Sequence, residues 1–255
     1  KNALDVNTAS NNTAVGWKAL TANTTGASNT AVGYDALGDN TTGSQMTAVG
    51  YGALDANTTG YNNTAFGYAS GGANTTGHSN VGLGAYTLMA NTTGTWITAI
   101  GAGSMQTGES GDGSTAVGYQ SLNIHTGDYN TAVGYRAMAL TTTGAVNVAV
   151  GKAALDANTT GNYNTAVGAE SLSTNTTASS NSAFGYNALN LNTTGHSNEA
   201  IGHQALPANT TGYYNTALGT QALQAVTTGN RNIGIGRLAG HKITTGLYNV
   251  NIGEW

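Results

Sequence analysis

A repeat of 17 residues runs through the chain and constrains its fold more than any other feature. The Gly that closes each Ala-Val-Gly-like motif recurs at this interval, as at Gly16, Gly33 and Gly50, and one interval of 16 separates Gly118 from Gly134. The consensus is Asn-Thr-Ala-Val-Gly-Tyr-x-Ala-Leu-x-x-Asn-Thr-Thr-Gly-x-x. A fixed short period indicates a repeat architecture rather than ordinary globular domains. We therefore predict a single uncapped repeat domain over residues 1–255, as a segment of a longer fibre.

The length of the unit limits the kind of repeat. Helical repeats need two helices and more than about 30 residues, and leucine-rich repeats need at least about 20 residues with several leucines. A coil of short strands and tight turns fits 17 residues, and such coils stack about 4.8 Å apart. The predicted fold class is all-β: a parallel β-solenoid, or β-roll, of about fifteen 17-residue coils.

Variation between the copies suggests which strand residues point inward. The middle residue of Thr-Ala-Val is Ala in most copies and Gly at Gly82 and Gly234, whereas its two neighbours vary among apolar residues. Residues two apart in a strand share a face. We predict that the Thr and Val positions and the Leu of Ala-Leu point inward, and that the small residue faces outward toward another chain. The candidate chain–chain face comprises Ala14, Ala31, Ala48, Ala65, Ala132, Ala166, Ala183 and Ala217.

Two further positions carry the turns. Each coil has two Gly positions, and both are predicted to have a positive φ, which Gly adopts without a Cβ penalty. The Asn of Asn-Thr-Thr-Gly, as at Asn23 and Asn40, also forms an Asn-x-Thr sequon. Glycans on every coil would crowd at the coil spacing, so these residues are predicted to form an Asn ladder in the turn.

Composition and residue spacing exclude several functions. The chain has no Cys, only 7% charged residues, and 7 Lys and Arg against 11 Asp and Glu. Zinc–cysteine sites and disulfides are excluded, and neither a nucleic-acid partner nor membrane insertion is expected. His78 and His196 occupy the same repeat position seven coils apart and cannot cooperate. We predict no enzyme activity, no catalytic residue, no cofactor and no metal. Three carboxylates of the irregular coils are assigned to a solvated loop rather than a Ca²⁺ site: Glu109, Asp112 and Asp128.

Two surface rows are candidates for binding. An aromatic residue often follows the marker Gly and would repeat once per coil, which suits contact with sugar rings or a partner chain. The Asn-x-Thr positions, such as Asn40 and Thr42, form a second regular array that would suit ice binding. The candidate ligand surface comprises Trp17, Tyr34, Tyr51, Tyr68, Tyr119, Tyr135 and Tyr186.

Units such as residues 29–33 and 164–168, both Asn-Thr-Ala-Val-Gly, resemble the repeats of trimeric autotransporter adhesin heads. Related Thr-Ala-Val-Gly-Tyr-x-Ala-Leu repeats occur in phage tail-fibre-like and bacterial surface proteins. The resemblance covers nearly the whole chain. It implies a left-handed parallel β-roll, three chains side by side, and display outside the cell for attachment.

The expected function is therefore an extracellular structural or adhesive fibre segment, of the adhesin-head or tail-fibre type, on a cell or virion surface. Its expected partners are further copies of the chain, with a trimer favoured over a filament, and a cell-surface receptor or glycan. Two alternatives stay open: a filament subunit joined end to end, and an ice-binding protein that uses the Asn-x-Thr array.

Overall fold

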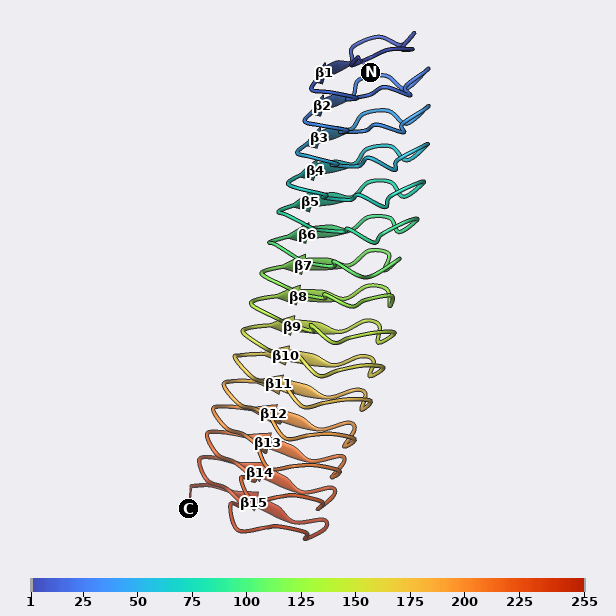
Figure 1. Ribbon diagram of the computed structural model, residues 1–255. Helices are drawn as coiled ribbons and strands as arrows, with labels where there is room; N and C mark the ends of the chain where they lie inside the picture. Colours follow the sequence, from blue (N-terminus) through green and yellow to red (C-terminus); the bar gives the residue numbers. More distant parts are fainter. Residues whose placement is uncertain (1, 255) are drawn as a thin grey trace. The chain divides into compact units, whose positions relative to one another are not determined.

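The computed structural model describes residues 2–254, in which every regular element is a β-strand. The chain falls into two compact units, residues 1–129 and 130–255, and each is a stack of coils of the same kind (Figure 1). The predicted all-β parallel solenoid with a 17-residue period is confirmed. The continuity of the repeat into one domain stays a prediction. Within residues 2–254, no helix has the length and apolar character needed to cross a membrane.

Each coil contributes one strand of three residues, and successive strands of a unit pair in parallel. Thr13, Ala14 and Val15 pair with the residues 17 positions later, so equivalent residues of neighbouring coils lie side by side. Parallel strands need a crossover of a dozen or more residues, and the rest of the coil supplies it. The strands of the first unit are β1 (Thr13–Val15), β2 (Thr30–Val32), β3 (Thr47–Val49), β4 (Thr64–Phe66), β5 (Val81–Leu83), β6 (Thr98–Ile100) and β7 (Thr115–Val117).

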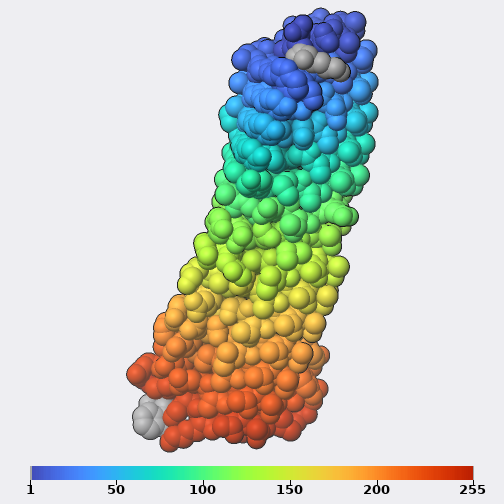
Figure 2. Space-filling view, viewed as in Figure 1, coloured from blue at the N-terminus to red at the C-terminus, as the bar shows by residue number. Residues whose placement is uncertain are grey.

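The second unit repeats this arrangement with the same register. Ala166 pairs with Ala149 on one side and with Ala183 on the other. Within each unit, successive coils lie in direct contact and appear as ordered bands of colour in Figure 2. The strands of this unit are β8 (Thr131–Val133), β9 (Val148–Val150), β10 (Thr165–Val167), β11 (Ser182–Phe184), β12 (Glu199–Ile201), β13 (Thr216–Leu218), β14 (Ile233–Ile235) and β15 (Val250–Ile252).

The strand faces are the reverse of the prediction. The middle Ala is buried, and the Thr and Val positions on either side are half-buried or exposed. The middle residue must be small because the interior of the coil is narrow. A Cβ built on Gly82 would lie 2.7 Å from Ser70 Oγ, and one on Gly234 would lie 2.8 Å from Leu223 Cγ. The proposed chain–chain face is therefore wrong. Seven of its members, Ala31, Ala48, Ala65, Ala132, Ala166, Ala183 and Ala217, are buried and Ala14 is partly buried.

The Leu row points inward, as predicted, and fills most of the apolar interior. Leu20, Leu37 and Leu155 are fully buried. These residues have φ values of 50–55°, in the left-handed region that side chains other than Gly rarely adopt. The left-handed conformation costs about 1–2 kcal/mol per residue, so burial of the Leu side chain, worth about 1.5–3 kcal/mol, offsets it. The sequence analysis did not predict this conformation, because Leu gives no signal of a positive φ.

The two Gly positions differ in their backbone. The marker Gly has the predicted positive φ, for example 141° at Gly33. The turn Gly, as at Gly26 and Gly43, does not have a positive φ, so that part of the prediction is wrong. A Cβ on Gly26 would instead collide with the carbonyl oxygen of Gly43 in the next coil. The turn position requires Gly because two coils approach closely there.

Two rows of buried Asn side chains run along the coils. In the turn row, Asn40 Nδ2 donates to Asn23 Oδ1 (2.7 Å) and to the carbonyl of Gly43 (3.0 Å). This confirms the predicted Asn ladder. A second row precedes the strands: the backbone N–H of Asn164 donates to Asn147 Oδ1 (2.9 Å). Because buried polar groups need partners, these rows hold each coil in register with the next.

Candidate functional site

The first four aromatic residues of the predicted ligand surface form one exposed stack, here called the aromatic ladder: Trp17, Tyr34, Tyr51 and Tyr68. Successive ring centroids are 4.7, 4.8 and 5.2 Å apart, and the two Tyr–Tyr pairs are within 9° of parallel. The side chains remain 41–52% exposed. Because each ring faces its neighbours in the stack, the exposed side of the ladder presents ring edges and Tyr hydroxyls, one ring per coil.

The ladder ends where the sequence changes. Ala85 and Ala102 occupy the next two places in the row, and Tyr86, one residue further along its coil, meets Tyr68 edge-on at 5.2 Å. Three predicted members of the surface lie outside the ladder although they are 46–51% exposed: Tyr119, Tyr135 and Tyr186. Tyr186 stacks on His203 at 5.5 Å instead. The stack of four rings thus ends at Tyr68, where the next ring meets it edge-on.

An ion pair joins two neighbouring coils beside the ladder. Lys18 Nζ lies 4.7 Å from the centroid of the Trp17 ring and 3.6 Å from a carboxylate oxygen of Asp35. Lys18, Asp35, Asp39 and Asp55 line a surface hollow of about 510 Å³. Burial raises the pKa of Asp55, and the negative charges of Asp35 and Asp39 add to the effect. The hollow is an acidic surface beside the aromatic ladder.

A second set of aromatic side chains follows the turn Gly, and the sequence analysis missed it. In the first unit, Tyr61 stacks on His78 (4.5 Å) and His78 meets Trp96 edge-on (5.6 Å). In the second unit, His196 stacks on Tyr213 at 5.1 Å. Each of these His residues contacts an aromatic residue of a neighbouring coil rather than another His, so the seven-coil separation of His78 and His196 gave no indication of the contacts. The sequence signal is an aromatic residue or His at either of the two positions after the turn Gly.

The titratable side chains of the irregular coils are engaged within the fold. His125 is fully buried, its Nε2 lies 3.3 Å from Ser114 Oγ, and burial lowers its pKa to about 4. Asp112 and Asp128 each accept a backbone N–H from the neighbouring coil, at 2.7 and 2.9 Å. Within residues 2–254, no three His, Asp or Glu side chains are grouped to hold a metal ion.

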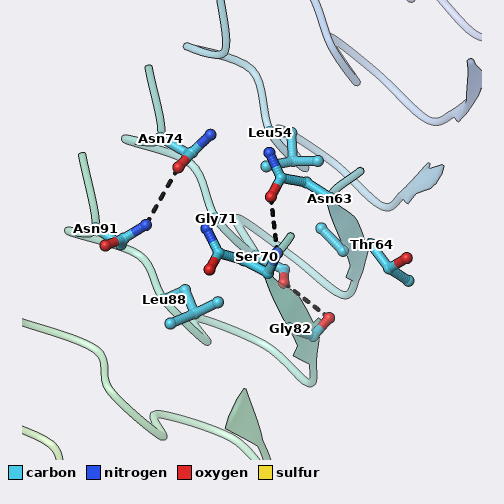
Figure 3. A pocket seen from close by; sticks show the side chains of 11 residues that line it. Leu54, Asn63, Thr64, Ser70, Gly71, Asn74, Gly82, Leu88 and Asn91 are labelled. Atoms are coloured by element: carbon cyan, nitrogen blue, oxygen red, sulfur yellow. Dashed lines mark hydrogen bonds between the residues drawn. The ribbon is translucent and has the colours of Figure 1, made fainter. Parts of the chain in front are cut away.

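A small void lies in the interior of the first unit, as shown in Figure 3. It measures about 10 Å³ and lies where Gly71 replaces the Leu of the inner row and Gly82 replaces the Ala. Ser70 Oγ lies 2.7 Å from Thr87 Oγ1 and donates to the carbonyl of Gly82 at 3.2 Å. A space of this size holds one water molecule at most. The void is therefore too small to bind a ligand larger than water.

The outer face of the strands is apolar, contrary to the prediction that these side chains are inside. Val15 is 58% exposed and Phe66 is 45% exposed in the first unit, and Ile201 is 44% exposed in the second. In the first unit this face carries no charged side chain, because its rows are Thr or Val on one side of the buried Ala and Val, Phe, Leu or Ile on the other. Contiguous exposed apolar surface marks an interaction site in many proteins.

The exposed surfaces of this chain, rather than any cavity, are therefore its candidate binding sites. Comparison of the chain with known protein families, curated proteins and solved structures finds no match.

Proposed function

We propose that the chain is a segment of an extracellular structural or adhesive fibre, displayed on a cell or virion surface, that attaches through repeated surface rows. The observation that carries this proposal is the exposed aromatic ladder, with four rings 4.7–5.2 Å apart. The exposed edges of these rings combine apolar C–H groups with hydroxyl and indole N–H groups, which suits contact with sugars and with partner chains. Several weak contacts on one rigid support add by multivalency. The proposed role involves no catalysis.

The strand face is the proposed contact between copies of the chain. It replaces the Ala row, which is buried within each coil. Val15, Val32, Val49 and Phe66 lie in neighbouring strands on one uncharged face, so a second copy could cover them. A trimer is favoured by the sequence resemblance to adhesin heads. Light scattering tests this point: Val32→Asp with Val49→Asp should reduce a trimer to monomers, and a wild-type monomer would contradict it.

The ice-binding alternative is weaker than the repeat suggests. Asn23, Asn40 and Asn57 are fully buried, which leaves the exposed Thr row, such as Thr42 and Thr59, as the displayed half of the Asn-x-Thr array. A single row gives a narrow contact with ice. We expect no thermal hysteresis, and measurable hysteresis that Thr42→Tyr with Thr59→Tyr abolishes would favour ice binding instead.

The aromatic ladder is tested by a quadruple variant. Replacing Trp17, Tyr34, Tyr51 and Tyr68 with Ala should lower attachment to cells or to a glycan array at least tenfold, because all four stacked rings are lost. The matched control replaces Tyr119 and Tyr186, which are equally exposed but outside the ladder. Circular dichroism should show the same β-structure in both variants. Attachment by the quadruple variant at the wild-type level would overturn the proposal.

A further inference from the structure

Five side chains of the second unit gather at the coil corner that follows the turn Gly. They are His196, Tyr213, Tyr214, Arg231 and Tyr248, here called the Arg231 corner. The Arg231 guanidinium carbon lies 6.0, 5.7 and 5.4 Å from the ring centroids of Tyr213, Tyr214 and Tyr248. Tyr213 and Tyr214 meet edge-on at 5.5 Å. The Arg231 cation thus lies between two Tyr rings of the preceding coil and one Tyr ring of the following coil.

The backbone of the corner holds these side chains outward. Tyr214, Arg231 and Tyr248 have φ values of 55–59°, the left-handed conformation that this position has throughout the repeat. Their N–H groups donate to carbonyls of the preceding coil at 3.0–3.2 Å. Tyr214 is 50% exposed and Tyr248 is 66% exposed. The corner is therefore an ordered, accessible surface, and a ligand that binds it avoids much of the entropic cost of ordering a loop.

The charge of Arg231 is uncompensated, unlike that of the other two arginines. Arg136 lies 3.4 Å from Asp156, and Arg237 lies 2.6 Å from Glu254. Among residues 2–254, Arg231 has no carboxylate within ion-pair distance, and its guanidinium donates to the Tyr248 hydroxyl. A guanidinium has five N–H donors in a fork that matches a carboxylate.

We propose that the Arg231 corner binds a carboxylate-bearing sugar of an acidic polysaccharide. The sugar ring packs against the exposed parts of the Tyr214 and Tyr248 side chains, and its carboxylate accepts hydrogen bonds from Arg231. Aromatic side chains supply the apolar contact, and a charge-assisted pair supplies the preference for an anion. This site deepens the proposed attachment function and rests on it. A nucleic acid fits less well, because phosphate chains require several cations and this corner has one.

The first unit contains a natural comparison. Its corner has aromatic and His side chains, Tyr61, His78 and Trp96, but no Arg. An acidic sugar would find the same kind of apolar surface there without the cation. Charge selectivity is therefore expected at the Arg231 corner only.

The test measures binding of tetragalacturonate to the full chain by calorimetry, with NMR to locate the site. Arg231→Gln should weaken binding at least tenfold, and Tyr214→Ala should weaken it several-fold. Arg237→Gln is the matched control, because this Arg of the same unit is already paired with a carboxylate; it should stay within twofold of wild type. Fully methyl-esterified tetragalacturonate, which has the same ring without the charge, should bind as weakly to wild type as the acid binds to Arg231→Gln.

Three results would overturn the site: equal binding of acid and ester, no effect of Arg231→Gln, or tighter binding of a sulfated galactose tetrasaccharide than of tetragalacturonate. The proposed fibre function fails separately. If the ladder variant loses attachment while Arg231→Gln leaves tetragalacturonate binding unchanged, the attachment function stands and this site is wrong. If the wild-type chain attaches to no cell or glycan surface but still binds tetragalacturonate through Arg231, the site stands and the attachment function is wrong.

Discussion

The two units are built from the same coil but keep different rows intact. In the first unit the aromatic ladder is continuous over four coils, whereas the Asn row before the strands is interrupted by Met46, Ile97 and Ser114. In the second unit the aromatic row is broken, and the Asn row runs without a gap through Asn130, Asn147, Asn164, Asn181, Asn198, Asn215, Asn232 and Asn249.

The difference teaches that inner and outer rows vary independently. Inner Asn residues determine how firmly neighbouring coils are joined, because their amides bond to both coils. Outer residues determine what the surface can bind, and they change without altering the coil. A repeat can therefore keep one fold and display different surfaces along its length.

The largest expected effect follows from breaking the continuous Asn row. Asn198 Oδ1 accepts the N–H of Asn215 (3.0 Å), and its Nδ2 donates to the carbonyl of Gly212 (2.8 Å). Asn198→Leu leaves the buried N–H of Asn215 without a partner and removes the bonds from Asn198 Nδ2 to the Gly212 carbonyl and to Asn181 Oδ1, although Asn209 still donates to Gly212. The free energy of unfolding should fall by about 4 kcal/mol, since an orphaned buried donor costs about 1–3 kcal/mol and each further lost hydrogen bond about 1 kcal/mol. Urea unfolding measures the change. Thr194→Leu, at an exposed site of the same coil, should lower the free energy of unfolding by under about 1 kcal/mol. Equal losses in the two variants would show that the Asn row does not contribute more to stability than an exposed residue.

A somewhat smaller effect should appear on acidification, through His125 of the first unit. His125 occupies the place of the turn Asn, and burial lowers its pKa to about 4, below the value of about 6.5 expected in the unfolded chain. The unfolded chain then binds more protons, so stability should fall as the pH drops from about 7 to 4, by about 3 kcal/mol in total.

The matched variant is His125→Asn, which restores the repeat residue. The raised pKa values of Asp55 and Asp156 act in the opposite direction, but they are common to both proteins and cancel in the difference. Above pH 7 the free energies of unfolding of wild type and His125→Asn should change with pH in the same way. Below pH 7 wild type should lose more stability than His125→Asn. Parallel curves between pH 7 and 4 would show that His125 does not titrate as expected.

The smallest effect should come from extending a ladder. Asn209 Oδ1 is buried without a hydrogen-bond partner among the described residues, because Val226 occupies the next Asn place in the turn row. Val226→Asn supplies the missing donor and should raise the free energy of unfolding by about 1 kcal/mol. The gain should vanish when Asn209 is also changed to Val; a gain that persists would have another cause.

The spacing of the repeat predicted much of the architecture. An interval of 17 residues excluded helical repeats and indicated stacked coils, and the Leu row and the turn Asn ladder were identified correctly from it. The aromatic ladder was also predicted to repeat once per coil. Its continuity over only four coils follows from Ala85 and Ala102, which are visible in the sequence once the row is known.

The strand faces, the turn Gly and the Arg231 corner were not predictable in the same way. A three-residue strand fits either orientation, because Ala tolerates burial in a narrow interior as well as contact with a partner. The turn Gly has an ordinary φ, and its need for Gly arises only from the neighbouring coil. The Arg231 corner gathers different residue types from successive coils, so no repeated letter marks it.

The amino-acid sequence by itself determined that equivalent residues of neighbouring coils lie side by side. A constant repeat of 17 residues allows strand residues and Asn side chains to pair with the equivalent residues of the next coil. Only the tertiary structure decided which side chains fill the interior. The width of that interior depends on the Leu and Asn rows arriving from the other sides of the coil, and it leaves room at the strand for a methyl group alone.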